Sequence, residues 1–389
     1  MKSLFSLIFI FSSLCAFSIR NYEHIKVGIF WDNRPTSVIV TVNEGAYDVY
    51  GDGEKIMAFP QNKMLVFKVE ANQVVISNFS ATYGSYQSVM LRAKTEHSSF
   101  NIKPNKPSLG SRIYPDHLNL SIYNSRLKLI NNTAFDKYLA GVVRSEAGNK
   151  HTLEYYKVQS IISRTYALKH WYRYKNLGFN LCDRVNSQVY HNMCYDNETI
   201  VEAVKVTEDI VIVDHEINLI TAVFHSNSGG KTLNSEDVWT KSLPYLKSKP
   251  DRFSFDMPHF DWKVTVSKAA WLNYFQTYYR LNLGNQHDVN AVLNFCPEDR
   301  ITVLQSSNAK VELTRIRSDF GLKSTFFCVN ESNGKVEITG KGYGHGVGLS
   351  QEGAMRMAVL GYPYTDILHH YYTDVHLIKL SAIDFFKGE

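Results

Sequence analysis

The spacing of apolar residues changes along the chain, and this change limits the possible fold more than any other feature. Residues 25–102 contain short runs in which apolar and polar residues alternate, such as Ile25–Phe30 and Ser37–Val42, with glycines between them. Such alternation with turn residues is typical of β-strands joined by tight turns. A polar stretch rich in turn residues follows at 103–110. We therefore expect an N-terminal β-rich module over 19–105 and a larger domain over 106–389.

Beyond residue 130 the apolar residues recur at helical spacing. The pattern predicts one helix over Phe135–Val143, stopped by Gly148, and a longer one from about Thr152 to Tyr172. A glycine-rich turn at 340–348 precedes a third predicted helix, at about Gln351–Leu360. Further expected elements are strands over 118–122, 126–130, 201–225 and 301–329 and a helix over 271–279. The expected fold class is α+β, with a mixed sheet around a long helix in the larger domain.

The first 18 residues are typical of a secretory signal peptide. Met1-Lys2 is basic, Leu4–Phe17 is almost entirely apolar, and Ala16 and Ser18 are the small residues expected at a cleavage site. An uncleaved membrane anchor is the alternative, although the apolar run is short for a span. The rest of the sequence contains no long apolar run. We therefore expect an exported protein with no membrane span after processing.

Four cysteines remain beyond this leader, as expected for a protein that forms two disulfides in an oxidising compartment. Three pairings are possible. Pairing Cys182 with Cys194 and Cys296 with Cys328 would close two local loops. A metal site that uses His191 beside the first pair is the alternative.

The net charge is modest, because 42 Lys and Arg oppose 37 Asp and Glu to give +5. No block of basic residues is present, so contact with an anionic polymer or surface fits this charge and nucleic acid is not expected as a partner. Aromatic residues make up 13% of the chain. Their rings suit stacking on sugars, although most are expected in the core.

Three short segments combine small residues with proton donors or acceptors: Ser145-Glu146, His225–Gly230 and Gly342–Gln351. Small residues allow a ligand to approach the backbone closely. A carboxylate at a helix end serves as a general acid when partial burial raises its pKa. Glu146 is the candidate for that role.

These segments belong to a longer series of motifs in a characteristic order. The chain carries Y-L-A-G-V-V-R-S-E at Tyr138–Glu146, a K-V-Q-S-I-I-S-R-T-Y-A helix at Lys157–Ala167, H-S-N-S-G-G-K-T at His225–Thr232 and G-Y-G-H-G-V-G-L-S-Q at Gly342–Gln351. Supporting matches are Arg112–Pro115, Leu127–Asn131, Gln188–Tyr190, Ser235–Trp239, Pro244–Leu246 and Gly353-Ala354. Over roughly residues 110–380 the sequence resembles the SpoIID family (stage II sporulation protein D), which includes amidase enhancers.

The resemblance implies a peptidoglycan lytic transglycosylase. Such enzymes cleave the MurNAc–GlcNAc bond of glycan strands that have lost their stem peptides, and they leave a 1,6-anhydro-MurNAc end. The family's catalytic glutamate corresponds to Glu146. No cofactor is implied, the partners are glycan strands and a cell-wall amidase, and the location is the periplasm or the wall side of a bacterial membrane.

The resemblance also suggests substrate contacts, most of which have a structural alternative. The candidate substrate-binding residues are Arg164, His225, Ser226, Ser228, Tyr343, His345 and Gln351. The alternatives are a structural ion pair for Arg164, a buried hydrogen-bonded ring for His225, backbone capping by the two serines and a helix N-terminal position for Gln351.

Asn186-Ser187 stand where zinc-binding members of the family have two ligands. We therefore expect no metal, with Cys182 in a disulfide with Cys194. Ala147-Gly148 replace a common Pro after Glu146, which changes the local turn.

Two other functions fit the same motifs. One is a non-catalytic wall-binding activator of an N-acetylmuramoyl-L-alanine amidase, which would hold glycan in the same groove. The other is a structural wall-binding protein whose N-terminal module recruits partners.

Overall fold

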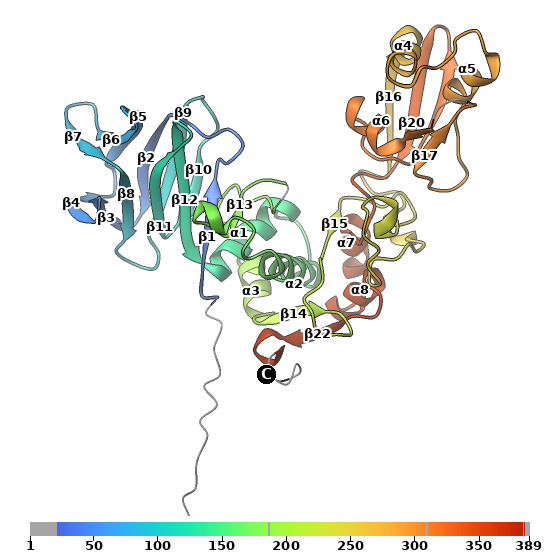
Figure 1. Ribbon diagram of the computed structural model, residues 1–389. Helices are drawn as coiled ribbons and strands as arrows, with labels where there is room; N and C mark the ends of the chain where they lie inside the picture. The colour runs from blue at the N-terminus through green and yellow to red at the C-terminus, as the bar shows by residue number, and fades with distance from the viewer. Residues whose placement is uncertain (1–21, 186, 308–309, 384, 386–389) are drawn as a thin grey trace, which may run out of the picture.

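The computed structural model describes residues 22–185, 187–307, 310–383 and 385, and Figure 1 shows them as two arms joined by a helical body. One arm is a pair of packed β-sheets, and the other ends in a small α/β unit. The expected signal peptide over residues 1–18 lies outside the described residues. In the part of the chain that the structure describes, no helix has the length and apolar character needed to cross a membrane.

The first arm is a sandwich of two sheets. The first sheet has the order β13 (Leu181–Cys182), β1 (His24–Ile29), β12 (Arg126–Ala134), β11 (His117–Tyr123), β8 (Ser88–Ala93), β3 (Ala46–Gly51), β4 (Glu54–Pro60). The second has the order β10 (Arg112–Pro115), β9 (Ser99–Lys106), β2 (Ser37–Glu44), β5 (Met64–Glu70), β6 (Gln73–Ser77), β7 (Thr82–Tyr86). Alternate residues such as Val38 and Val40 are fully buried between the sheets, as the period-2 pattern predicted.

The sandwich extends past the expected module boundary at residue 105. Strands β10, β11 and β12 all follow that residue, and residues 129–134 of β12 pair with the whole of β1 from the start of the chain. Residues 106–134 therefore complete the sandwich, because their edges are satisfied by hydrogen bonds to earlier strands. The strands expected over 118–122 and 126–130 are β11 and β12, which form a hairpin with left-handed backbone at Asn124 and Ser125.

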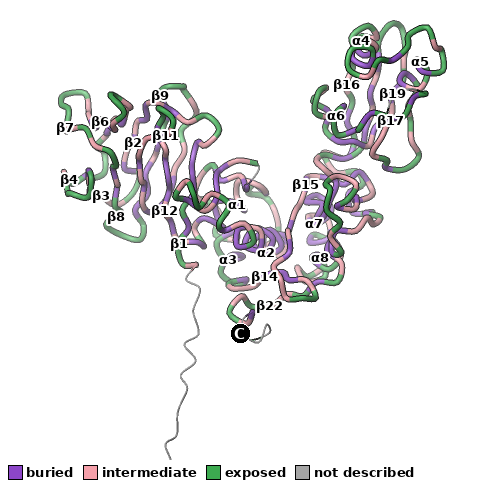
Figure 2. The backbone as a smooth tube through the Cα atoms, in the orientation of Figure 1, coloured by how far each residue is buried: buried purple, intermediate pink, exposed green. Residues whose placement is uncertain are grey.

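The helical body follows directly after β12, and its centre is the longest helix, α2. Its elements are α1 (Phe135–Ala147), α2 (Leu153–Lys169), α3 (Glu198–Val206), α7 (Gln351–Val359) and α8 (Tyr364–Tyr371), with an antiparallel pair β14 (Ile210–Val213) and β22 (His376–Lys379) and a parallel pair β15 (Phe224–His225) and β21 (Leu349–Ser350). Figure 2 shows α2 as a mostly buried tube inside this body. The α+β class predicted from the sequence is confirmed.

Local sequence signals explain where these helices begin and end. Gly148 ends α1 with φ 76°, and the Thr152 side chain accepts a hydrogen bond from the Tyr155 N–H to cap α2. The strand expected from residue 201 is instead helix α3. Its buried residues Ile200, Ala203 and Val204 follow helical spacing, and strand structure begins only at β14.

A separate α/β unit is inserted between the two halves of the body. It contains β16 (Asp261–Ser267), α4 (Lys268–Tyr279), α5 (Gln286–Leu293), β17 (Val303–Gln305), β18 (Lys310–Glu312), α6 (Leu313–Asp319), β19 (Phe327–Ser332) and β20 (Lys335–Lys341). Trp271, Phe275 and Ile338 belong to a hydrophobic core of its own. The strand expected over 301–329 is interrupted by α6. The insertion returns the chain directly to the glycine-rich turn at residue 342.

Candidate functional site

Glu146 lies in the last turn of α1 and is half-buried. One carboxylate oxygen, Oε1, accepts a hydrogen bond from the backbone N–H of Val189 at 2.8 Å. Burial raises the pKa of Glu146, and the hydrogen bond from Val189 opposes only part of this effect. No ion pair of Glu146 is found within the described residues. The carboxyl group therefore keeps its proton to a higher pH than an exposed glutamate does.

The loop that carries Val189 is held closely against α1. The N–H of His191 donates to Ser145 Oγ at 3.3 Å, and the Tyr190 ring packs against Tyr138 with centroids 5.0 Å apart. A Cβ atom at Gly141 would lie only 2.5 Å from the Tyr190 ring. Gly141 in the Y-L-A-G-V-V segment is thus required for this approach, which brings the Val189 N–H to Glu146.

A buried chain of amides and hydroxyls connects the α1 and α2 region to the C-terminal motif. The Gln159 side-chain oxygen accepts hydrogen bonds from Tyr155 OH and from Gln351 Nε2, each at 3.3 Å. Burial is the main cause of the raised pKa of Tyr155, and the negative charge of Glu146 adds to it. Gln351 is therefore a buried link between helices and does not face solvent.

The His225 and His345 segments meet on the other side of this link. β15 and β21 pair in parallel, so that the two imidazole rings lie with centroids 5.5 Å apart. The His225 Nδ1–H donates to the carbonyl oxygen of Val347 at 3.1 Å, and the Val347 N–H donates to Nδ1 of His345 at 3.1 Å. Burial is the main cause of the low pKa of both rings and lowers that of His345 to about 4, so both are neutral at pH 7.

Trp239 adds an accessible aromatic surface to this pair. Its ring lies against His345 with centroids 5.2 Å apart, and the residue is 39% exposed. A partly exposed indole of this kind can stack on the apolar face of a sugar. Trp239 was part of the matched motif Ser235–Trp239, but no site role was predicted for it.

Two arginines from the insertion surround the histidines with positive charge, and sequence reasoning missed both. Arg300 is 9% exposed, and its guanidinium nitrogens have no hydrogen-bond partner among the described residues. Nη1 packs on Gly346 so closely that a Cβ atom there would be 1.9 Å away. Arg317 lies near enough to lower the pKa of both His345 and Arg300. No local motif marks these arginines, because only the return of the chain from the insertion brings them to the glycine turn.

Arg164 occupies a structural position, which does not support the substrate contact expected for it. It is 2% exposed and donates hydrogen bonds to the carbonyl oxygens of Val204 at 3.1 Å, Thr207 at 2.8 Å and Ile210 at 3.3 Å. These carbonyls belong to the last turn of α3, to its C-cap Thr207 and to the first residue of β14. The guanidinium thus satisfies backbone groups that the helix leaves without partners.

The remaining predicted contacts differ in their access to solvent. Ser228 is buried and its hydroxyl donates to Asp251 at 2.7 Å, so a direct substrate contact is not supported. The backbone oxygen of Ser226 accepts from the Glu352 N–H. Tyr343 is exposed, and its ring lies beside His259 and under the Lys323 ammonium. Of these residues, Tyr343 is the one placed to meet a ligand.

The cysteines follow the predicted pairing only in the insertion. Cys296 and Cys328 form a disulfide, whereas Cys182 and Cys194 are free thiols. Cys182 is buried on β13, the edge strand of the first sheet, where its sulfur is 3.3 Å from Ser187 Oγ. The described residues contain no group of three or more His, Cys, Asp or Glu side chains placed to hold a metal ion.

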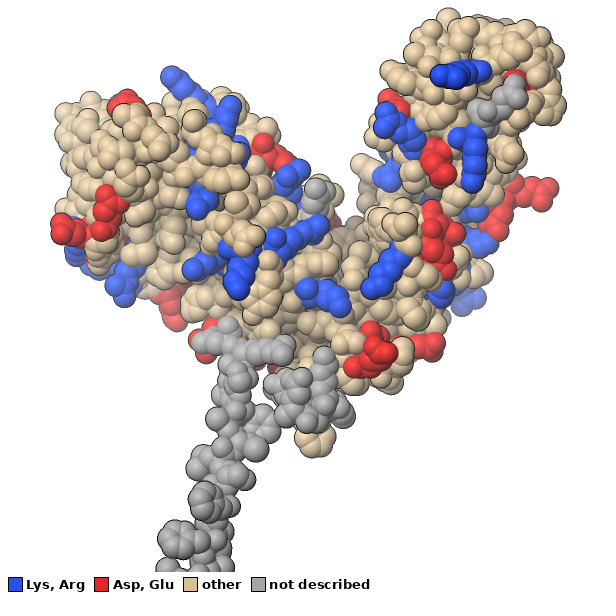
Figure 3. All heavy atoms as spheres, viewed as in Figure 1, with Lys and Arg blue, Asp and Glu red and all other residues tan. Residues whose placement is uncertain are grey.

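Figure 3 shows an open notch in the surface between the sandwich and the second arm. On the visible face the charged side chains between the sandwich and the floor of the notch are mainly Lys and Arg. An anionic polymer would meet a favourable potential there.

Known proteins that are similar to this chain carry the family names that the motifs suggested. Residues 123–213 match the SpoIID family model, described as stage II sporulation protein. Stage II sporulation protein D of Bacillus amyloliquefaciens is 27% identical over 79% of this chain and 92% of its own length, and that of Bacillus subtilis is 26% identical over 68% and 80%. The amidase enhancer of Bacillus subtilis is 27% identical over 84% of this chain but 53% of its own length.

The matched segment holds Glu146, Val189 and the whole of α2. The relatives extend the similarity well beyond that segment into the rest of the chain. The chain therefore carries a SpoIID match over residues 123–213 and is similar to stage II sporulation protein D and to an amidase enhancer over most of its length.

Proposed function

We propose that this protein is an exported peptidoglycan lytic transglycosylase in which Glu146 acts as the single acid and base. The observation that carries the proposal is the state of this carboxyl group. It is half-buried at a helix end, has a raised pKa and is held by one backbone N–H from Val189. A general acid for glycoside cleavage needs such a raised pKa, because it must be protonated near neutral pH.

The chemistry balances with one carboxyl group. Glu146 donates its proton to the glycosidic oxygen as the bond from the MurNAc anomeric carbon to that oxygen breaks. The C6 hydroxyl of the same MurNAc then attacks the anomeric carbon, and the Glu146 carboxylate takes the hydroxyl proton. No water enters, and the intramolecular attack has a high effective molarity. Hydrolytic glycosidases usually need a second carboxylate to activate water or to form a covalent intermediate.

The Val189 N–H has a specific part in this cycle. It donates to Oε1 at 2.8 Å and therefore stabilises the carboxylate that exists between the two proton transfers. It also fixes the orientation of the carboxyl group, because the loop is itself bonded to Ser145 and packed on Gly141. The remaining oxygen is the one available to the substrate.

The decisive experiment compares the parent protein with Glu146→Gln on purified glycan strands freed of stem peptides. The parent is expected to release products with 1,6-anhydro-MurNAc ends, each one water lighter than a hydrolysis product by mass spectrometry. Glu146→Gln keeps the shape and can still accept from Val189 N–H, but it has no proton to transfer. Equal anhydro product from the variant would remove Glu146 from the mechanism.

A second candidate function is supported by the similarity to a protein named amidase enhancer. In that case the protein would bind glycan and stimulate a separate amidase without cleaving sugar bonds. Glu146→Gln would then stimulate the amidase as well as the parent does, and neither protein would release anhydro ends. The structural wall-binding alternative predicts neither activity, and removing residues 22–134 tests how much of the wall binding the sandwich supplies.

A further inference from the structure

Two adjoining pockets form a groove along the sandwich. One, of about 650 Å³, is lined by Asp32, Asn33, Arg34, Lys106 and Arg126 among others. The other, of about 520 Å³, shares Asp32 and Asn33 with it and continues to the 183–192 loop. The shared residues make the two pockets continuous. We call them together the sandwich groove.

The inner end of this groove adjoins the Glu146 region. His191 and Asn192 line the second pocket, and the His191 N–H donates to Ser145 Oγ beside Glu146. Val189, two residues before His191, donates to Glu146 itself. One loop therefore forms both the wall of the groove and the support of the carboxyl group. A polymer bound along the groove would lead toward Glu146.

The outer end of the groove carries positive charge that no carboxylate in the structure neutralises. The whole groove has five cationic side chains, Arg34, Lys106, Arg112, Arg126 and Arg184, and two carboxylates, Asp32 and Asp183. Both carboxylates are already paired, Asp183 with Arg112 at 2.6 Å and Asp32 with Arg184. The three cations left after these two pairs are Arg34, Arg126 and Lys106. Within the described residues, none of them forms an ion pair.

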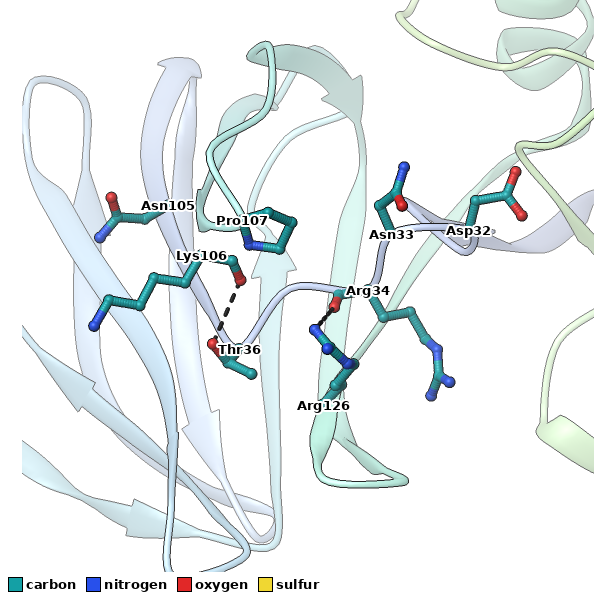
Figure 4. Close-up of a pocket in the computed structure, with 8 residues that line it drawn as sticks. All are labelled: Asp32, Asn33, Arg34, Thr36, Asn105, Lys106, Pro107 and Arg126. Atoms are coloured by element: carbon teal, nitrogen blue, oxygen red, sulfur yellow. Dashed lines mark hydrogen bonds between the residues drawn. The ribbon is translucent and has the colours of Figure 1, made fainter.

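Arg34 and Arg126 are also held in place. Figure 4 shows them side by side in the outer pocket, with Nη1 of Arg126 donating to the Arg34 carbonyl oxygen at 3.0 Å. The Arg34 guanidinium lies 5.0 Å from the Trp31 ring and 4.9 Å from the Tyr123 ring, and it donates one bond, to the Tyr123 carbonyl oxygen. Most of its N–H groups are left for a ligand. Planar guanidinium groups with fixed orientation suit carboxylates.

We propose that the sandwich groove is a distal subsite that binds the lactyl carboxylates of a glycan strand whose MurNAc residues have lost their peptides. The inference rests on the proposed function for the identity of the polymer. Removal of a stem peptide exposes a carboxylate on each MurNAc, so a stripped strand is a regular polyanion. Arg34 and Arg126 bind these carboxylates some distance from Glu146, and the groove thereby selects long stripped strands over short or peptide-bearing ones.

Binding is tested without turnover by placing every variant in the Glu146→Gln background. The ligand is a long stripped glycan strand, with a chitin oligosaccharide as the probe that lacks carboxylates. Arg34→Gln with Arg126→Gln keeps side-chain amide donors but removes both charges, and we expect about a fivefold loss of affinity for the stripped strand. Affinity for the chitin oligosaccharide is expected to stay unchanged. The loss should shrink at high salt, because exposed charges are then screened.

The matched control removes the same charge from the same sandwich. Lys63 and Arg92 are exposed and lie outside the groove, so Lys63→Ala with Arg92→Ala is expected to keep full affinity. Arg34→Lys with Arg126→Lys restores charge and is expected to recover part of the binding. Equal loss in the control pair would mean that general charge and not the groove is responsible, which overturns the proposal.

Two further results would also overturn it. One is unchanged affinity of the Gln pair for the stripped strand. The other is a result in which the arginines are needed for binding polyphosphate but not for binding glycan. That result would assign the groove to a phosphate polymer. In an active background the Gln pair should lower product release from long strands and leave short fragments unaffected. If the parent released no anhydro product, the proposed chemistry would be rejected. The binding measurements would still test the sandwich groove by themselves.

Discussion

Replacing Arg164 by Ala distinguishes a structural role from the substrate contact that the sequence suggested. The side chain donates to the carbonyl oxygens of Val204, Thr207 and Ile210, and burial lowers its pKa only to about 10, so it stays charged at neutral pH. A hydrogen bond from a charged donor contributes about 1.5–3 kcal/mol. Partial rehydration of the freed carbonyls reduces the sum, so we expect a cost of about 4 kcal/mol to the packing of α3 on α2.

The assay is backbone hydrogen exchange followed by mass spectrometry, because it reports on α3 separately from the rest of the chain. A loss of about 4 kcal/mol corresponds to exchange in α3 that is faster by about 10³-fold. Lys169→Ala is the control, since Lys169 is exposed on the same helix and should change exchange little. If Arg164→Ala left α3 protected but abolished glycan binding, the structural assignment would be refuted.

Three other outcomes follow from the described contacts. Burial raises the folded pKa of Glu146 above its unfolded value, so the parent protein loses stability as the pH rises through the folded pKa. Glu146→Gln should therefore be at least as stable as the parent at pH 7, and it should have no advantage at about pH 4. Thermal unfolding at the two pH values measures this difference. Replacing Cys296 and Cys328 by Ser should destabilise the insertion by about 3.5 kcal/mol while the sandwich melts unchanged in calorimetry. Titration with a thiol reagent should find Cys194 slowly reactive in the folded protein and Cys182 reactive only after unfolding, whereas a protein with no free thiol would restore the pairing first expected.

The limits of prediction from sequence are clearest in the cysteines and the module boundary. The even number of cysteines suggested two disulfides, of which Cys296–Cys328 is present. The count gives no information about which cysteines lie close together, however, and Cys182 on β13 and Cys194 are both free thiols. The polar stretch at 103–110 likewise has the composition of a linker, but strands on both sides of it belong to one sandwich.

The candidate site likewise contains residues whose positions the sequence predicted and residues whose positions it did not. Glu146 was expected at a helix end with a raised pKa, and the structure places it there. Arg164 was expected among the substrate-binding residues, yet its guanidinium bonds to the end of α3. Arg300 was not considered, and it packs against the glycine turn that carries His345. The positions of Arg164 and Arg300 do not depend on the residues adjacent to them in sequence.

Short-range signals were sufficient for α1 and α2, because capping groups and helical spacing act within a few residues. The partners of Arg164, the free thiol of Cys182 and the approach of Arg300 to Gly346 depended on the completed packing. These contacts join residues that are far apart along the chain. They are selected by the total burial and hydrogen bonding of the folded protein, which no single segment encodes.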